Sequence, residues 1–130
     1  MVDPSEVSLR CLIVDDNALF LEGAAALLRR EGLDVIGVAS NSAQAIQLVS
    51  ELRPDVTLVD IDLGDESGFD VARRLAAAAD PALSLIIISS HDGDDFKELL
   101  EASPALGFVS KSSLSGDAIR AVLETKGSAT

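Results

Sequence analysis

Short apolar runs alternate along the chain with longer segments in which apolar residues recur at helical spacing. The runs predict strands at Leu9–Asp15, Asp34–Val38, Asp55–Asp60, Ser84–Ser90 and Leu106–Val109. The periodic segments predict helices at Asn17–Glu31, Ser42–Leu52, Ser67–Ala79, Asp94–Ala102 and Leu114–Glu124. Regular strand–helix alternation predicts a single α/β domain, in which right-handed crossovers place helices on both faces of a parallel sheet.

Several predicted helices carry local start and stop signals. Asn17 can cap the first helix, and Gly32 follows its last turn. Pro54 and Pro104 follow the second and fourth helices, and a proline cannot continue the helical hydrogen-bond pattern. The run Ser84–Ser90 is the most hydrophobic of the strands, which predicts a central strand that is buried on both faces.

Length and composition fit one cytoplasmic domain. A chain of 130 residues is long enough for its own hydrophobic core, and no apolar stretch approaches the ~20 residues of a membrane span. The first residues lack the basic and apolar regions of a secretory signal, and the one cysteine, Cys11, cannot form an internal disulfide. We expect the domain to occupy residues 9–124, with flexible ends at 1–8 and 125–130.

The formal net charge of −12 argues against direct binding of nucleic acid by this domain, because such binding neutralises phosphates with Lys and Arg. An acidic balance is often no more than a solvated surface. Here, however, part of the excess lies at or just after predicted strand ends, at Asp15, Asp16, Asp60, Asp62, Asp65 and Glu66. These acids are therefore candidates for a binding site.

Four of the predicted strands end in a residue suited to phosphoryl chemistry or are closely followed by one. Asp15 ends the first strand and Asp16 follows it, Asp60 ends the third, Ser89 lies at the end of the fourth, and Lys111 closely follows the fifth. In a parallel sheet all these carboxyl ends lie on one edge, where open α/β folds bind their ligands. Three acids, a hydroxyl and a lysine at one spot predict a site for Mg²⁺ and a phosphoryl group.

At these positions the chain resembles the receiver domains of bacterial response regulators, over roughly Leu9 to Leu123. The resemblance rests on Ile13-Val14-Asp15-Asp16-Asn17, on Leu58-Val59-Asp60-Ile61-Asp62-Leu63 with Gly68 eight residues beyond Asp60, on Ile87-Ile88-Ser89-Ser90 and on Gly107-Phe108-Val109-Ser110-Lys111. Each motif is weak alone, but their order, spacing and strand-end positions together are specific. The resemblance implies a doubly wound (βα)5 fold with strand order 2-1-3-4-5.

The resemblance also implies a role for each acid of the site. Asp60 would be the phosphoacceptor and would receive its phosphoryl group from a kinase histidine. Asp16 would bind Mg²⁺ directly, Asp15 through a metal-bound water, and Asp62 through its backbone carbonyl, with Mn²⁺ able to replace Mg²⁺. The plain alternatives are a turn acid at Asp60 and two acids that stabilise a helix N-terminus at positions 15 and 16.

The remaining site residues would respond to the phosphoryl group. By resemblance, Lys111 would pair with the acceptor and a phosphoryl oxygen, Ser89 would be the switch hydroxyl, and Phe108 would be the switch aromatic residue. Ser90 and His91 would tune the lifetime of the acyl phosphate by controlling water access. Core packing is the alternative for Phe108, and an exposed polar loop residue is the alternative for His91.

The implied output is a change of one face rather than catalytic turnover. Phosphorylation adds ~1.5–2 negative charges, and this would repack the surface formed by the fourth helix, fifth strand and fifth helix. A sensor histidine kinase would donate the phosphoryl group, and an output domain, a partner protein or a second phosphorylated copy would bind the altered face. Regulation of transcription is the expected process, and a stand-alone receiver and a part of a longer regulator are both open.

The sequence departs from the receiver pattern at three positions. Gly64 stands where proline is common, which predicts a mobile loop at residues 64–68. Glu66 adds a further acid that we expect beside the metal. Ser112 stands where the family often has a cis proline, so no slow isomerisation is expected at that bond.

Two other functions compete with a phosphoacceptor. A phosphatase of the haloacid-dehalogenase type also uses an Asp-x-Asp, which Asp60 and Asp62 would fit, but it needs a further acidic pair on a strand after Lys111. Only Asp117 and Glu124 follow that lysine, both in a predicted helix. A receiver-like binding module that ignores phosphate is the second alternative. A dinucleotide-binding domain is excluded, because no glycine-rich turn follows the first strand.

Overall fold

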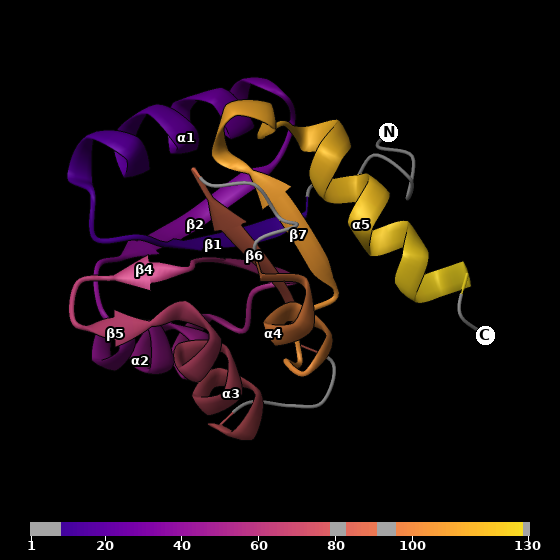
Figure 1. Cartoon of the computed structure of the whole chain (residues 1–130). Helices are drawn as coiled ribbons and strands as arrows, with labels where there is room; N and C mark the ends of the chain where they lie inside the picture. The colour runs from indigo at the N-terminus through magenta and orange to yellow at the C-terminus, as the bar shows by residue number, and fades with distance from the viewer. Residues whose placement is uncertain (1–8, 79–82, 91–95, 129–130) are drawn as a thin grey trace.

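The computed structural model describes residues 9–78, 83–90 and 96–128, with only the backbone described for 125–128. Its main sheet contains β1 Arg10–Val14, β2 Asp34–Ala39, β3 Val56–Asp60, β6 Ser84–Ser89 and β7 Gly107–Ser110. These strands pair in the order β2-β1-β3-β6-β7, and every neighbouring pair is parallel. Numbered as in the prediction, the order is 2-1-3-4-5, so the predicted doubly wound α/β fold is confirmed (Figure 1).

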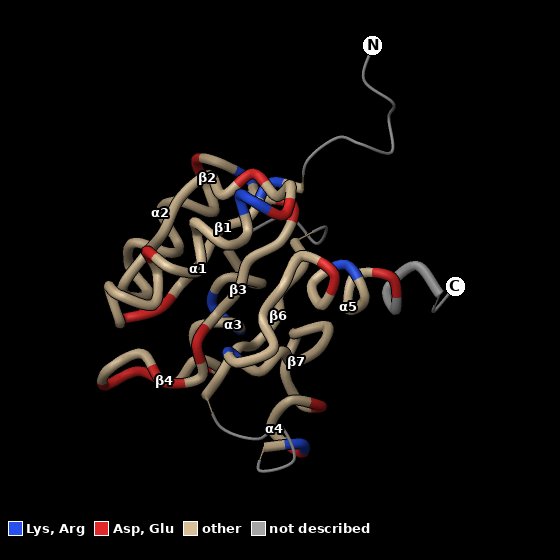
Figure 2. Tube along the Cα trace, turned by 90° about the horizontal axis from the view of Figure 1, so that it is seen from above, with Lys and Arg blue, Asp and Glu red and all other residues tan. Residues whose placement is uncertain are grey.

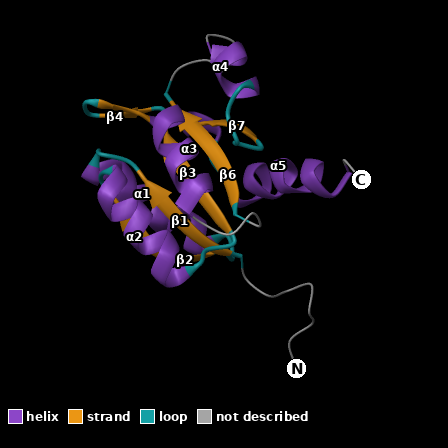
Figure 3. Ribbon diagram, turned by 90° about the horizontal axis from the view of Figure 1, so that it is seen from below, coloured by secondary structure: helices purple, strands orange, loops and turns teal. Residues whose placement is uncertain are grey.

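Helices flank this sheet on both sides (Figure 3). In the described residues they are α1 Ala18–Arg30, α2 Ser42–Leu52, α3 Gly68–Ala78, α4 Lys97–Glu101 and α5 Gly116–Ser128. Figure 1 shows α1 and α5 on one side and α2 and α3 on the other. None of the helices in these ranges has the length and apolar character needed to cross a bilayer.

Alternate strand residues supply two separate cores, one on each face of the sheet. In β6, Ile86 and Ile88 pack beneath α1 and α5, whereas Leu85 and Ile87 pack beneath α2 and α3. Burial on both faces requires an unbroken apolar run, which is why this strand is the most hydrophobic. It is an interior strand between β3 and β7, as its sequence predicted.

A short hairpin after β3 was not predicted. Its strands are β4 Asp62–Leu63 and β5 Glu66–Ser67, which pair antiparallel. Gly64 has a φ of 63° at the first position of the two-residue loop. A left-handed φ at this position is typical of type II′ hairpin turns and favours glycine over other residues. The segment that we expected to be a mobile loop is therefore a hairpin in the structure.

Some helix boundaries also differ from the predictions. The last helix begins at Gly116 rather than Leu114, because Ser115 caps it and accepts a hydrogen bond from the Ala118 N–H at 3.0 Å. Its backbone continues to Ser128, beyond the predicted end at Glu124. α4 begins at Lys97, and the predicted first residues of that helix lie partly outside the described ranges. A single 3-10 turn, Lys111–Ser113, follows β7.

Candidate functional site

Four neighbouring strands bring the predicted polar residues to one edge of the sheet. Asp15 directly follows β1 and donates its N–H to the Ala39 carbonyl at 2.9 Å, which extends the β1–β2 pairing by one residue. Asp60 is the last residue of β3, Ser89 is the last of β6, and Lys111 directly follows β7. The predicted convergence of these side chains is therefore built by the parallel register of the sheet.

Three carboxylates form the centre of this edge. One oxygen from each of Asp15, Asp16 and Asp60 lies within 4.8 Å of the other two. Asp15 is fully buried and Asp60 is 6% exposed, whereas Asp16 faces solvent. Hard carboxylate oxygens, partly open to water, are the donors that Mg²⁺ and similar cations prefer. The residues therefore suit a divalent metal ion, as predicted.

The electrostatic cost of this cluster is visible at Asp60. Burial raises the pKa of its carboxyl to about 6, and the negative charge of Asp15 adds to this effect. Lys111 and a hydrogen bond from the Asp62 backbone act in the opposite direction but do not cancel it. Three carboxylates face one ammonium group, so a divalent cation would relieve the remaining repulsion.

Lys111 lies between two of the carboxylates and above an aromatic ring. Its Nζ is 2.6 Å from Asp15 Oδ2 and 3.5 Å from Asp60 Oδ2. The pairing with Asp60 that the resemblance implied is present, but Asp15 is the nearer partner. The same nitrogen lies 4.3 Å from the centroid of the Phe20 ring. Burial alone would lower the pKa of Lys111, yet the two carboxylates raise it overall, so the side chain stays charged.

Gly68 allows the backbone to close tightly behind Asp60. Its N–H donates to the Ile61 carbonyl at 2.7 Å. A Cβ atom at this residue would lie 2.1 Å from the Asp60 carbonyl oxygen and 2.7 Å from the Ile61 Cα. No side chain fits at such distances from rigid backbone, so α3 can approach β3 this closely only with glycine at its first position.

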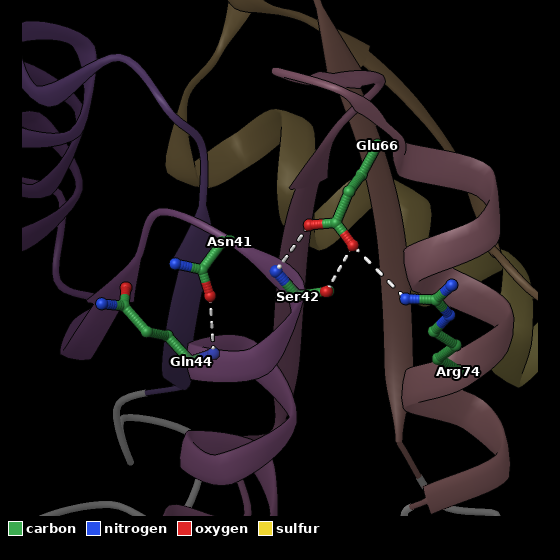
Figure 4. A network of polar contacts seen from close by, with 5 residues as sticks. All are labelled: Asn41, Ser42, Gln44, Glu66 and Arg74. Carbon is green, nitrogen blue, oxygen red and sulfur yellow. Dashed lines mark hydrogen bonds and ion pairs between the residues drawn. The ribbon is translucent and has the colours of Figure 1, made fainter.

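Asp62 and Glu66 belong to the hairpin, and red segments mark it in Figure 2. Asp62 has an exposed side chain at the start of β4. The expectation that Glu66 lies beside the metal was wrong. Its carboxylate accepts hydrogen bonds from the Ser42 N–H and hydroxyl at the start of α2, and it pairs with Arg74 of α3 at 3.3 Å (Figure 4).

Glu66 therefore ties the hairpin to two helices. Its hydrogen bonds with the hydroxyl and the N–H of Ser42 lower the pKa of the Glu66 carboxyl, and Arg74 adds to that effect. Gly64, in the loop of the same hairpin, lies near the acidic cluster instead, since a Cβ there would approach Asp16 Oδ2 to 3.8 Å. The carboxylate that stabilises the hairpin and those that could bind a cation thus belong to different clusters.

The predicted switch residues lie along β6 and β7. Ser89 is buried, with 1% of its surface exposed. Phe108 is half-buried, and its ring centroid is 5.7 Å from that of Phe96 at an interplanar angle of 53°. Ser90 is exposed immediately after β6, and His91 lies outside the described residues.

Phe20 is a site residue that the sequence analysis did not single out. Its position matched the apolar stripe of the first helix, and this pattern gave no indication that its ring would meet a charged group. Asn17 behaves as predicted: its Oδ1 caps α1 by accepting from the Phe20 N–H at 3.1 Å. The cap sets the first turn of α1, and with it the start of the helix that carries the ring.

A family model and two curated relatives all relate this chain to response regulators and similar signalling proteins. A family model described as response regulator receiver domain matches residues 11–124. The sensory transduction protein LytT of Bacillus subtilis is 35% identical over 85 residues, which are 65% of this chain and 35% of that protein. The DNA-binding response regulator MtrA of Mycobacterium tuberculosis is 38% identical over 81 residues, 62% of this chain and 34% of that protein. The matched region is about a third of each relative's length.

Solved structures agree with this assignment. The signal receiver domain of the putative response regulator NarL from Mycobacterium tuberculosis superposes with a TM-score of 0.77 at 28% identity, covering 91% of this chain and 95% of that one. A LuxR-family response regulator from Aurantimonas sp. SI85-9A1 gives the same TM-score and identity, covering 91% and 84%. The likeness therefore extends over nearly all of the fold described above.

Proposed function

The chain belongs to the response regulator receiver family, and from this premise we propose that it is a phosphoacceptor switch of two-component signalling. One observation carries the proposal: Asp60 stands at the end of β3 with two further acids and the ammonium group of Lys111 around it. The proposed domain is residues 9–124, although the backbone of α5 continues to Ser128. The proposed setting is the cytoplasm, and the proposed donor is a sensor histidine kinase.

The proposed reaction is transfer of a phosphoryl group to Asp60. An oxygen of its carboxylate attacks the phosphorus atom, the new O–P bond forms as the N–P bond of a phosphohistidine breaks, and the histidine leaves with the bonding electrons. With a pKa of about 6, the carboxyl is largely ionised at neutral pH, as a nucleophile must be. Lys111 places positive charge beside the oxygens of the group in transfer.

Asp15, Asp16 and Asp60 would hold a Mg²⁺ or Mn²⁺ ion, with the Asp62 backbone carbonyl as a further donor. When bound, the ion supplies positive charge to the phosphoryl oxygens and offsets the repulsion among the acids. The chain's own contribution is to hold the carboxylates together. The Asp15 side chain is buried, and its Oδ1 accepts a hydrogen bond from the Asn17 N–H at 2.8 Å. Burial and this hydrogen bond hold the Asp15 carboxylate in place.

The proposed output is repacking of the face formed by α4, β7 and α5. A new dianionic group at Asp60 would draw Ser89 and Lys111 toward it, and Phe108 would turn with them. Phe108 already packs on Phe96 beside α4, so its movement would change the surface of that helix. An output domain, a partner protein or a second copy would bind the changed face, and regulation of transcription is the proposed consequence.

The phosphatase alternative is tested by turnover. We expect the chain with Mg²⁺ to release no more p-nitrophenol from p-nitrophenyl phosphate than buffer does, because a receiver accepts an activated phosphoryl group without cycling on stable esters. The control is Asp60→Asn, which separates activity of this site from a contaminant. Linear, multiple-turnover release that disappears in Asp60→Asn would contradict the receiver proposal and support a phosphatase.

A further inference from the structure

Lys111 contacts two kinds of partner, the charged carboxylates of Asp15 and Asp60 and the uncharged ring of Phe20. Its Nζ pairs with Asp15 and Asp60 at 2.6 and 3.5 Å, and it stands 4.3 Å from the centre of the Phe20 ring. The Lys111 side chain is only 17% exposed, so water competes weakly for it. The carboxylates attract any cation that enters, whereas the ring carries no net charge and attracts the Lys111 ammonium that stands over its face.

The Asp15 carboxylate has one oxygen available for both Lys111 and a metal ion. Its Oδ1 accepts the Asn17 N–H at 2.8 Å, which leaves Oδ2 to face Lys111. A cation beside Asp15 would share the charge of that carboxylate and weaken the shortest contact of the lysine. Phosphorylation of Asp60 would convert its carboxylate, the second partner of Lys111, to an acyl phosphate. The ring of Phe20 binds neither a metal nor a phosphoryl group, so neither event removes the ring as a partner of Lys111.

We propose that Phe20 is a positioning residue, whose ring holds the Lys111 ammonium beside Asp60 while the carboxylates are occupied by metal and phosphoryl group. This inference rests on the proposed function of Asp60 as acceptor. The ring is supplied by α1, which is fixed at its first turn by the Asn17 cap, and the lysine is supplied by the turn after β7. The contact thus joins the first helix of the chain to the far end of the sheet.

The first test observes the contact itself. The chain has three lysines, so the signals of the ¹³C-labelled Cε methylene of Lys111 can be assigned, with Lys97 and Lys126 as internal references. We expect the ring current of Phe20 to shift the Lys111 signal upfield with and without Mg²⁺. Phe20→Leu should abolish the shift and Phe20→Tyr should retain it. A Lys111 signal that matches the other two lysines in the wild type, or moves to their position on addition of Mg²⁺, would overturn the inference.

The second test measures phosphorylation by acetyl phosphate with Mg²⁺. Loss of a cation–π contact predicts a rate about two- to fivefold lower in Phe20→Leu and near the wild-type rate in Phe20→Tyr. Leu19→Ala, which alters an 81% exposed neighbour on the same helix, should also match the wild type. In a Lys111→Met background the Phe20→Leu change should have no additional effect, because the ammonium that the ring holds is gone.

The outcomes separate this inference from the proposed function. A wild-type rate in Phe20→Leu, or an equal loss in the presence and absence of Lys111, would overturn the positioning role while leaving Asp60 as the acceptor. Thermal unfolding of each variant distinguishes a misfolded chain from a repositioned lysine. If the wild type itself gained no phosphoryl group, the proposed function would fail, and the ring-current shift would still support or overturn the contact independently.

Discussion

Replacing Gly68 with alanine is expected to lower the free energy of unfolding by about 3 kcal/mol, near the upper end of the usual cost of overpacking. The added Cβ would lie 2.1 Å from the Asp60 carbonyl oxygen and 2.7 Å from the Ile61 Cα. Both neighbours are backbone atoms that cannot rotate away, so α3 or the end of β3 must shift. The effect is measured by urea denaturation, as a lower midpoint with an unchanged slope.

Gly23 provides the matched control for this substitution. It lies inside α1, and a Cβ there would meet nothing within 4 Å. Gly23→Ala should be neutral or stabilising by up to about 1 kcal/mol, since alanine favours a helix interior more than glycine does. Equal midpoints for Gly68→Ala and the wild type would show that the close approach between α3 and β3 is not a constraint on the fold.

The second expected result is that Asp60→Asn stabilises the metal-free chain, and increasingly so as the pH rises. The folded pKa of Asp60 is about 6, above the ordinary 3.8, because of burial and the charge of Asp15. The folded state therefore binds this proton more tightly than the unfolded state, so ionisation costs stability as the pH rises from about 4 to about 6. The full cost above that window is roughly 3 kcal/mol, and the asparagine variant avoids it.

The comparison is made by urea denaturation in a chelating buffer between pH 5 and pH 8. Asp65→Asn is the control for net charge, because Asp65 is an exposed acid in the hairpin loop and its substitution removes the same charge. Its stability should follow the wild type across the range. Parallel curves for the wild type and Asp60→Asn would contradict the raised pKa. Saturating Mg²⁺ should reduce the difference in unfolding free energy between Asp60→Asn and the wild type, because the ion stabilises the ionised Asp60.

The parallel sheet and its site edge could be predicted from the sequence because both depend on local pattern. A strand such as β6, buried on both faces, must be apolar throughout, and its last residue then marks the edge of the sheet. The strand end at Asp60 was placed correctly for this reason, and the end of the next strand, predicted at Ser90, lies one residue earlier at Ser89. The cap at Asn17 was also placed correctly, because it depends on a local contact with the first turn of α1. The positions of the acids therefore followed from strand boundaries alone.

The remaining features depend on contacts between distant segments. The two-residue strands of the β4–β5 hairpin are too short to produce a periodic pattern. Glu66 was assigned to the metal because it is near Asp60 in sequence, but its partner Ser42 lies 24 residues earlier, at the start of α2. The ring of Phe20 beneath Lys111 joins residues from opposite ends of the chain. Helical spacing indicates which residues are apolar but not which charged group they meet.

The arrangement of charges gives the site a simple physical account. Two buried acids, Asp15 and Asp60, and the exposed Asp16 are held together against their repulsion, with the ammonium group of Lys111 as partial compensation. The cluster therefore carries an excess of negative charge. Binding of a cation or transfer of a phosphoryl group would change that local charge. A switch needs this sensitivity, whereas a purely structural cluster would be expected to balance its charges.

The central claim, that Asp60 accepts a phosphoryl group, is tested most directly by intact mass. The wild type and Asp60→Ala are incubated with acetyl phosphate, each with Mg²⁺ and with a chelator. The account predicts a gain of one phosphoryl group for the wild type with Mg²⁺, and no gain in the other three samples. A gain that persists in Asp60→Ala, or an unmodified wild type with both acetyl phosphate and a histidine kinase as donors, would contradict it.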